Sequence, residues 1–197
     1  MDAPDSLLTG LGPVVDRRTR VVVLGSFPGK ASLVAAQYYA HPRNHFWPIV
    51  SRLVGIDLVA LPYPRRLAAL RAGGVGLWDV YAACRREGSL DTAIEDAEFN
   101  DLTRLVRAAP TLQAIFHNGG ESARAMKRSA ALGVPVERLP STSPANASWS
   151  FERKLAAWRE AFERHGVFPR SERRAVPRPA SIPLGDRRTY SSDEGLQ

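Results

Sequence analysis

The feature that most constrains the fold lies at residues 21–29, where the apolar run Val21–Leu24 ends abruptly in the sequence GSFPG. A short apolar run of this kind is typical of a buried strand, and the glycine and proline residues mark a turn at its carboxyl end. In open α/β sheets, ligands bind outside the carboxyl ends of the strands. The turn at residues 25–29 is therefore a natural place for a functional site.

A second informative stretch follows at residues 37–47, with the sequence QYYAHPRNHFW. It combines aromatic rings, amides and imidazoles. This mixture is not typical of a strand in the hydrophobic core. Rings with polar neighbours suit a flat ligand that has hydrogen-bonding edges and is tethered to negative charge.

Apolar periodicity along the rest of the chain predicts strands that alternate with helices. Strands are expected at residues 21–25, 75–80, 112–117 and 134–139, and helices at residues 44–54, 65–72, 99–108, 121–131 and 148–165. Residues 1–20 are expected to pack onto the domain as a small helix or loop, and residues 82–91 to form a polar loop. This alternation predicts an α/β fold, a three-layer sandwich with a central, mostly parallel four-stranded sheet.

The chain has 197 residues, of which 44% are hydrophobic, enough for one domain with a substantial core. The periodicity collapses after Phe168, where prolines are scattered among arginines and acidic residues. A segment of this composition cannot bury enough apolar surface to become ordered. We therefore expect a single catalytic domain at residues 1–167 and a flexible Pro/Arg-rich tail at residues 168–197.

The net charge and the cysteine content limit the functions that this protein can have. The 27 Lys and Arg residues against 20 Asp and Glu residues give a net charge of +7, which suits a polyanionic partner and equally a soluble basic surface. The single cysteine, Cys84, excludes an intramolecular disulfide and a four-cysteine iron–sulfur cluster, and is expected to be a buried thiol. No apolar run reaches the roughly 20 residues of a membrane span, and the start lacks a basic signal region, so we expect a cytoplasmic protein.

Polar turns follow three of the predicted strands, at residues 25–29, 118–120 and 141–146. Their amides and hydroxyls could bind phosphate oxygens, although serine and asparagine are also common helix N-caps. The candidates for phosphate or strand contacts are Ser26, Gly29, Gly119, Ser141, Ser143 and Asn146. No phosphate-loop lysine or GxGxxG motif is present, and His41 and His45 lack a helical carboxylate partner, so we expect neither a cofactor nor a metal.

Taken together, GSFPG, QYYAHPRNHFW and the later PSTSPANA resemble the uracil-DNA glycosylase superfamily, and most closely its hypoxanthine-DNA glycosylase (DNA-deoxyinosine glycosylase) branch. The AHPRNHFW element is also similar to that of the mismatch-specific uracil-DNA glycosylases. The resemblance covers about residues 20–165. It implies a parallel sheet, no metal or cofactor, and removal of a deaminated base from DNA after the nucleotide is flipped into a pocket.

The resemblance assigns roles to several residues. Tyr39 matches the aromatic position on which the base stacks, Phe27 and Tyr38 are further candidates, and Asn118 is placed in the same pocket; core packing is the alternative for each ring. The second family motif, at residues 141–146, grips the DNA strand and lacks the bulky wedge of many relatives.

The first motif departs from the family pattern. In most of the superfamily an Asp or Asn there positions the attacking water, whereas this chain has Phe27, which cannot hold water. In the hypoxanthine branch the asparagine of HPRN, here Asn44, is implicated instead. Judged from the residues alone, Asn44 is an N-cap for the following helix, and both roles could coexist through different atoms.

Asp79 matches the strand-end asparagine that reads uracil in the classical branch. A carboxylate accepts the N1–H of hypoxanthine or the N3–H of uracil and repels the bare N1 of adenine. The alternative for Asp79 is a surface residue paired with Arg85 or Arg86.

These observations predict a monofunctional DNA glycosylase, active as a monomer on hypoxanthine first, with Asn44 and Asp79 as catalytic residues. The alternatives are a uracil or mismatch-specific DNA glycosylase, or an inactive nucleic-acid-binding relative. Lys30 is the only lysine in the motifs, which disfavours a Schiff-base lyase.

Overall fold

A central parallel sheet organises the computed structural model, which describes residues 7–167. Its strands are β2 (Val21–Gly25), β3 (Val75–Asp79), β6 (Ala114–Asn118) and β7 (Val136–Leu139), in the order β3-β2-β6-β7 with every neighbouring pair parallel. This confirms the predicted α/β fold with a four-stranded parallel sheet. The expected tail at residues 168–197 lies outside the described residues.

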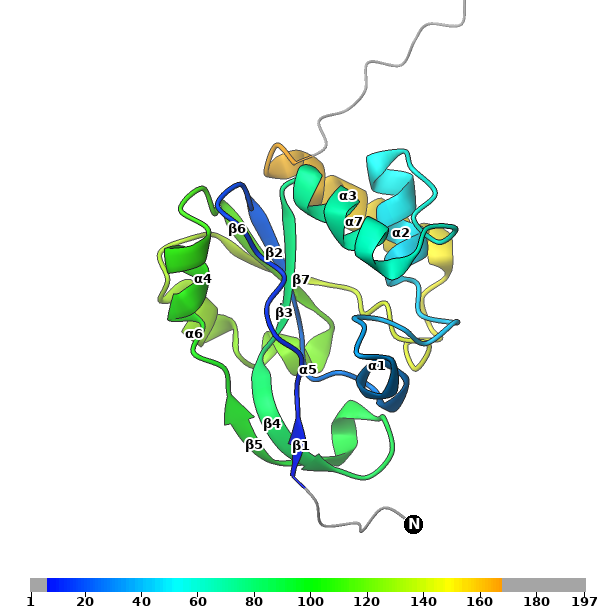
Figure 1. Cartoon of the computed structure of the whole chain (residues 1–197), viewed down its shortest axis with the longest axis vertical. Coiled ribbons are helices and arrows are strands. Elements are labelled where there is room, and N and C mark those ends of the chain that lie inside the picture. Colours follow the sequence, from blue (N-terminus) through cyan, green and yellow to red (C-terminus); the bar gives the residue numbers. More distant parts are fainter. Residues whose placement is uncertain (1–6, 168–197) are drawn as a thin grey trace, which may run out of the picture.

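Helices cover both faces of this sheet (Figure 1). One face carries α2 (Phe46–Val54), α3 (Tyr63–Ala72) and α7 (Phe151–Arg164), and the other carries α4 (Thr103–Ala108) and α6 (Met126–Ala130). Two short helices, α1 (Lys30–Ala35) and α5 (Gly120–Ala123), follow the carboxyl ends of β2 and β6.

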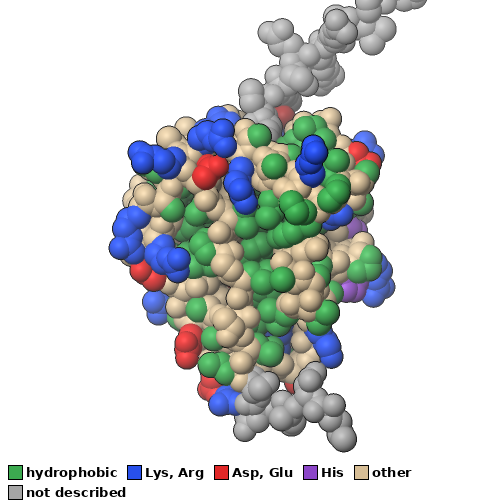
Figure 2. Space-filling model, viewed as in Figure 1, with side chains coloured by type: hydrophobic (Ala, Val, Ile, Leu, Met, Phe, Trp, Pro, Cys, Tyr) green, Lys and Arg blue, Asp and Glu red, His purple; other side chains and the backbone are tan. Residues whose placement is uncertain are grey.

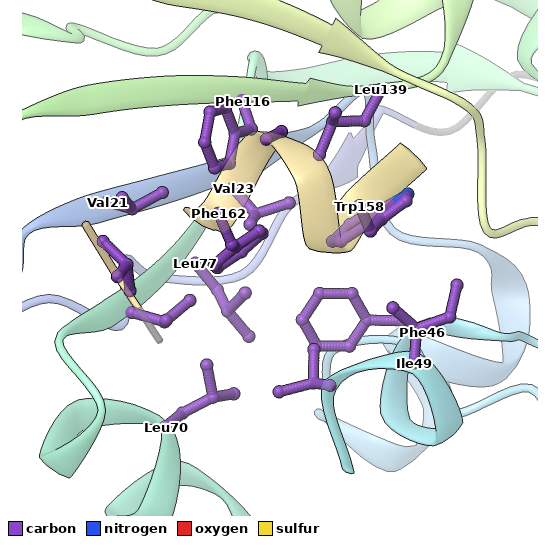
Figure 3. Packing of buried hydrophobic residues seen from close by; sticks show 14 of the residues in the cluster. Val21, Val23, Phe46, Ile49, Leu70, Leu77, Phe116, Leu139, Trp158 and Phe162 are labelled. Atoms are coloured by element: carbon purple, nitrogen blue, oxygen red, sulfur yellow. The ribbon is translucent and has the colours of Figure 1, made fainter. Parts of the chain in front are cut away.

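The alternation of side chains along β2 explains why the strand is apolar throughout. Val21 and Val23 pack into the cluster that contains Phe46 and Trp158, as Figure 3 shows, whereas Val22 and Leu24 pack into the cluster on the opposite face. All four side chains are fully buried. A strand covered by helices on both faces needs apolar residues at every position, because successive side chains point to opposite faces.

A second, antiparallel sheet was not predicted. It consists of β1 (Leu8–Thr9), β4 (Tyr81–Arg86) and β5 (Ile94–Phe99), in the order β1-β4-β5, with the 3-10 helix η1 (Asp91–Ala93) in the β4–β5 connection. The first half of the predicted polar loop at residues 82–91 is therefore wrong, because it belongs to β4. The described part of residues 1–20 is, apart from β1, a loop, and it packs onto the domain as expected, through Leu8, Leu11, Val14 and Val15. Cys84, in β4, is buried as expected.

The helix boundaries also differ from the expectation. The helix expected at 99–108 begins only at Thr103, because Phe99 ends β5. The helix expected at 121–131 is divided into α5 and α6, and α2 begins at Phe46 rather than Asn44. Helix α1 was not predicted at all. Its six residues make fewer than two helical turns, too few for an apolar periodicity to show in the sequence.

A buried histidine ties the sheet to the helices behind it. His117 is fully buried in β6, with Nδ1 2.8 Å from the Ser122 hydroxyl and Nε2 2.9 Å from the Ser129 hydroxyl. The Ser122 hydroxyl donates to the Leu24 carbonyl at 2.7 Å, so it accepts from Nδ1–H, and Nε2 accepts from Ser129. Burial favours the neutral imidazole, in which this pattern of donors and acceptors is satisfied.

We expect this network to make stability depend on pH. Burial lowers the pKa of His117 from 6.5 to about 4, so the unfolded chain binds a proton between these pH values and the folded chain does not. The free energy of unfolding should therefore fall as pH decreases from 6.5 to about 4, by about 3 kcal/mol from this residue. Because other groups contribute slopes of their own, among them Asp79 with its raised pKa and a slope of opposite sign, the contribution of His117 is the difference between the slopes of the wild type and of His117→Asn, each measured by urea unfolding across this pH range. An unchanged slope in that variant would contradict the assignment.

Candidate active site

A cleft of about 690 Å³ opens at the carboxyl ends of the parallel strands. Residues 25–29 after β2, Asp79 at the end of β3, Asn118 at the end of β6 and residues 141–146 after β7 all line it. All the predicted site residues except Gly119 border this cleft, namely Ser26, Phe27, Gly29, Tyr39, Asn44, Asp79, Asn118, Ser141, Ser143 and Asn146. The parallel topology thus gathers segments that are far apart in the sequence.

Gly119 has a structural role beside the cleft. Its φ of +102° lies in the region that favours glycine, and a Cβ there would lie 2.8 Å from the Cβ of Ser141. A glycine is therefore required for β6 to end in close contact with the 141–146 segment.

Asp79 lies at the bottom of the cleft and is 3% exposed. Its Oδ2 atom has no hydrogen-bond partner among the described residues. The neighbouring Gly25 leaves room for this carboxyl group, because a Cβ at position 25 would lie 2.3 Å from Oδ1 of Asp79. Arg85 forms an ion pair with Asp96 at 3.4 Å. The alternative of a surface Asp79 paired with Arg85 or Arg86 is therefore wrong.

The environment of Asp79 favours its protonated form. Burial and, to a smaller extent, the negative charge of Asp91 together raise the pKa of this carboxyl group from 3.8 to about 8, with Arg86 opposing both effects. Asp79 is consequently mostly neutral at pH 7, whereas the sequence suggested a carboxylate. A protonated carboxyl group presents a hydrogen-bond donor and an acceptor side by side.

Tyr39 is placed next to Asp79 by an unusual backbone conformation. Its φ of +55° lies in the left-handed region, which is uncommon for a tyrosine. The ring stacks on Phe46, with centroids 4.0 Å apart and planes 19° apart. The hydroxyl is buried and makes no well-formed hydrogen bond among the described residues, and it would lie 3.5 Å from a Cβ on Gly25. Burial, and next the charge of Asp79, raise the pKa of this hydroxyl, and the nearby Asn118 side chain, which is itself engaged with Thr142, opposes them.

The bottom of the cleft thus holds two buried polar groups with unsatisfied hydrogen-bonding capacity, on Asp79 and Tyr39. An unsatisfied buried polar group costs about 1–3 kcal/mol, so such groups are rare in native proteins and call for an explanation. A ligand that inserts a polar edge between them would satisfy both.

Phe27 and Tyr38 pack mainly into the cores. Phe27 is 5% exposed, belongs to the cluster around Trp78, and has the Arg86 guanidinium 5.1 Å from its ring centroid. Tyr38 belongs to the opposite cluster, and its hydroxyl donates to the carbonyl of Gly12 at 3.0 Å. Both rings border the cleft, but their packing accounts for most of their surface.

Asn44 uses one end of its amide to support the start of α2. The N-cap of this helix is His45, so the expectation that Asn44 is the N-cap is wrong by one residue. Asn44 Oδ1 accepts the backbone N–H of Phe46, the first residue of the helix, at 2.9 Å. Nδ2 has no partner among residues 7–167, and Asn44 lines the cleft. The side-chain oxygen is therefore engaged in a local turn, and the donor group is left for another role.

Asn118 holds the second motif in place. Its Oδ1 accepts the backbone N–H of Thr142 and its Nδ2 donates to the Thr142 hydroxyl, both at 2.9 Å. Thr142 is fully buried, and its carbonyl accepts the backbone N–H of His45 at 2.9 Å. The sequence did not single out Thr142, although it is the residue that joins the two loops.

The other polar residues of the second motif bond within the loop. Ser141 Oγ accepts from the Ser143 amide and Ser143 Oγ from the Ala145 amide, each at 3.2 Å, and Asn146 donates to the Ser141 carbonyl at 3.1 Å. Lys154, buried in α7, lies 3.5 Å from the Ser143 carbonyl and supports the loop from behind. The loop is therefore shaped before any ligand binds.

Sequence reasoning missed Asp91. This residue of η1 lines the cleft because the β4–β5 connection folds under the strand ends, where Figure 1 shows it beside α1. Its Oδ1 accepts the hydroxyl proton of Ser26 at 2.7 Å, so Ser26 is engaged by Asp91. The available signal was an acidic residue three positions after Gly88 in a polar segment, a pattern that is too common in loops to single out.

The chain belongs to the uracil DNA glycosylase superfamily, whose sequence profile matches residues 13–164. This confirms the resemblance inferred from the motifs.

Two relatives, both named hypoxanthine DNA glycosylase, come from Methanosarcina barkeri and Methanosarcina acetivorans. The first is 40% identical over 155 residues and the second 37% over 156, and each match covers 79% of this chain and 98% of the relative. A solution NMR structure of a Methanosarcina acetivorans protein assigned as a uracil DNA glycosylase is similar at 34% identity, with a TM-score of 0.74. That match covers 82% of this chain and 99% of the other.

The surface agrees with the basic composition. On the face seen in Figure 2, Lys and Arg side chains are spread over the surface and outnumber the acidic ones. Within residues 7–167, no three His, Cys, Asp or Glu side chains are grouped so that they could hold a metal ion, and no helix is long and apolar enough to cross a membrane.

Proposed function

We propose that this protein is a monofunctional DNA glycosylase that hydrolyses the N-glycosidic bond of a flipped, deaminated base, with hypoxanthine as its preferred substrate. One observation carries the proposal: the unsatisfied polar groups of Asp79 and Tyr39 at the bottom of a cleft of about 690 Å³. Membership in the uracil DNA glycosylase superfamily and 40% identity to a protein named hypoxanthine DNA glycosylase support the choice of substrate.

The hydrogen-bonding edge of a deaminated base is complementary to the side chain of Asp79. Hypoxanthine presents N1–H and O6 on one edge, and uracil presents N3–H and O4, so each offers a donor beside an acceptor. A neutral carboxyl group pairs with such an edge through two hydrogen bonds, since it also offers one donor and one acceptor. As the glycosidic bond breaks, negative charge develops on the departing base, and the carboxyl O–H stabilises it where a carboxylate would repel it.

The other groups of the cleft complete the site. Tyr39 and the stacked Phe46 behind it form an aromatic wall beside the base edge, and the free Nδ2 of Asn44 donates to the base or to the attacking water. Because Asn118 is occupied by Thr142, it acts by holding the second motif against the bound strand.

A cleavage assay tests the proposal directly. Oligonucleotides that contain hypoxanthine, xanthine or uracil, single-stranded and in duplexes, are incubated with the protein and then treated with alkali. We expect strand breaks that require alkali, fastest for hypoxanthine. Fastest cleavage at uracil would indicate the uracil-specific alternative. Binding of these oligonucleotides without cleavage would indicate an inactive binding protein, the alternative that the buried Phe27 favours.

Variants of Asp79 test whether its side chain acts as a neutral carboxyl group or as a carboxylate. Asp79→Ala should reduce excision of hypoxanthine by more than about tenfold, or about 1.4 kcal/mol, and affect binding to abasic DNA less. Asp79→Asn should retain most activity, because an amide also offers a donor and an acceptor. The wild-type rate should fall as pH rises through about 8, since the protonated form is then lost, and Asp79→Asn should not show this decline. Rate measurements from pH 6 to pH 10 provide the comparison, and a strongly impaired Asp79→Asn would favour the carboxylate.

A further inference from the structure

Hydrolysis requires a group that accepts a proton from the attacking water, and among the predicted residues only Asp79, which is buried and mostly neutral, has a carboxyl group. Phe27, in the first motif, is apolar. The side-chain oxygen of Asn44 is bound to the Phe46 N–H, and that of Asn118 to the Thr142 N–H, each at 2.9 Å. What these amides leave open is their N–H donors, which cannot take a proton from water. The acceptor must therefore come from elsewhere in the cleft.

Two of the residues that line the cleft carry a carboxyl group, Asp79 and Asp91. They occupy different environments. Asp79 is buried at the bottom, whereas Asp91 is exposed in the cleft and has one oxygen held by the Ser26 hydroxyl. The second oxygen of Asp91 has no partner among the described residues. Paired carboxyl groups whose environments separate their pKa values are the usual arrangement of a general acid and a general base.

The charges around Asp91 decide which of the two groups stays ionised. Burial raises the pKa of Asp91 above its ordinary value, and the Ser26 hydrogen bond and Arg86 lower it, while Glu121 on α5 raises it. Arg86 is 9% exposed, donates to the Pro28 carbonyl, and has Nε and Nη1 without partners among the described residues. The positive charge of the Arg86 guanidinium thus offsets part of the rise in the pKa of Asp91 that desolvation in the cleft causes.

We propose that Asp91 is the general base of the proposed glycosylase and takes the place of the polar residue absent from the first motif. The C1′–N bond breaks and its electron pair leaves with the base, which receives a proton from Asp79 or solvent. The water oxygen bonds to C1′ and passes one proton to the free oxygen of Asp91, which later releases it to solvent. The negative charge of Asp91 also stabilises the positive charge that develops on the sugar. This inference rests on the proposed function.

The decisive variant is Asp91→Asn, which keeps the side-chain shape and an oxygen that accepts from Ser26 but removes the charge and the basicity. Single-turnover cleavage of a hypoxanthine duplex should fall about thirtyfold, while binding to abasic DNA changes less than about threefold. The matched control is Asp96→Asn, on the same hairpin outside the cleft. It removes the same charge, and asparagine tolerates the φ of +46° at this position.

A pH profile separates a catalytic from a structural role. The wild-type rate should rise with pH through the pKa of Asp91, and Asp91→Asn should lose this acid limb. Ser26→Ala removes the hydrogen bond that lowers the pKa of Asp91, so its acid limb should move to higher pH at nearly unchanged melting temperature. Because the charge of Asp91 raises the pKa of Asp79, Asp91→Asn should also move the alkaline limb to lower pH, whereas the acid limb reports Asp91 itself. Arg86 and Glu121, which act on Asp91, are unaltered in both variants.

Several results would overturn the inference. Asp91→Asn with wild-type cleavage would exclude Asp91 as the base, and a loss in His41→Gln in that case would assign the role to the imidazole that also lines the cleft. If Asp91→Asn does not fold, an unshifted acid limb in Ser26→Ala contradicts the proposal independently. A wild-type protein that cleaves none of the deaminated bases refutes the proposed function itself, whereas an active wild type with an active Asp91→Asn refutes this inference alone.

Discussion

Replacing Asn44 by alanine is expected to lower the single-turnover rate of cleavage about a hundredfold, or about 3 kcal/mol of transition-state stabilisation. The side chain does two things through different atoms. Its Oδ1 supports the start of α2 by accepting the Phe46 N–H, and its Nδ2 has no partner among the described residues. Loss of this hydrogen bond should cost about 1 kcal/mol of stability, much less than the effect on the rate. Rapid-quench kinetics and thermal melting on the same variant separate the two contributions.

Asn44→Asp tests which atom matters for the chemistry. Aspartate offers an acceptor oxygen as asparagine does, but when ionised it has no hydrogen to donate. Wild-type stability with lost cleavage would show that the Nδ2 donor is required. A fully active Asn44→Ala would restrict Asn44 to supporting the start of α2 and leave the positioning of the water to Asp91. We expect that Phe27→Asn does not restore activity to Asn44→Ala, because Phe27 is 5% exposed and covered by Arg86.

Replacing Gly25 by alanine is expected to have a similarly large effect, again about a hundredfold on the cleavage rate. The new methyl group would lie 2.3 Å from Oδ1 of Asp79 and 3.5 Å from the Tyr39 hydroxyl, between the two groups that meet the base. The first contact is impossible, so the carboxyl group must move. It is the free end of a side chain, and the fold can absorb this movement more easily than a shift of the backbone. We therefore expect lost cleavage with a small change in melting temperature.

Gly12→Ala provides the matched control for Gly25→Ala. An added Cβ at position 12 meets nothing within 4 Å, and the residue lies outside the cleft. This variant should cleave at the wild-type rate. If Gly25→Ala also cleaved normally, the placement of Asp79 against the base would be contradicted. A loss of cleavage accompanied by unfolding would instead indicate that β2 cannot tolerate a side chain at its end.

The sequence by itself determined the parallel sheet and the position of the cleft. The run Val21–Leu24 is apolar at every position because both faces of β2 are covered, and a continuous apolar run is visible without knowing its partners. The turns at residues 25–29 and 141–146 mark strand ends through local glycine and proline residues, and parallel strands bring such ends to one edge. The buried strand and the strand ends depend on residues that are close together in the chain, and for this reason they can be predicted from the amino-acid sequence.

Only the tertiary structure decided how the site works. The β4–β5 hairpin has polar residues along β5 and pairs through its backbone, which leaves no apolar pattern, and it alone carries Asp91 to the cleft. The protonation of Asp79 depends on burial beneath segments distant in sequence and on the charges of Asp91 and Arg86. The division of Asn44 into an oxygen that supports α2 and a free N–H depends on where α2 begins. Burial, charge proximity and hydrogen-bond partners are properties of the assembled fold, and a residue's identity does not specify them.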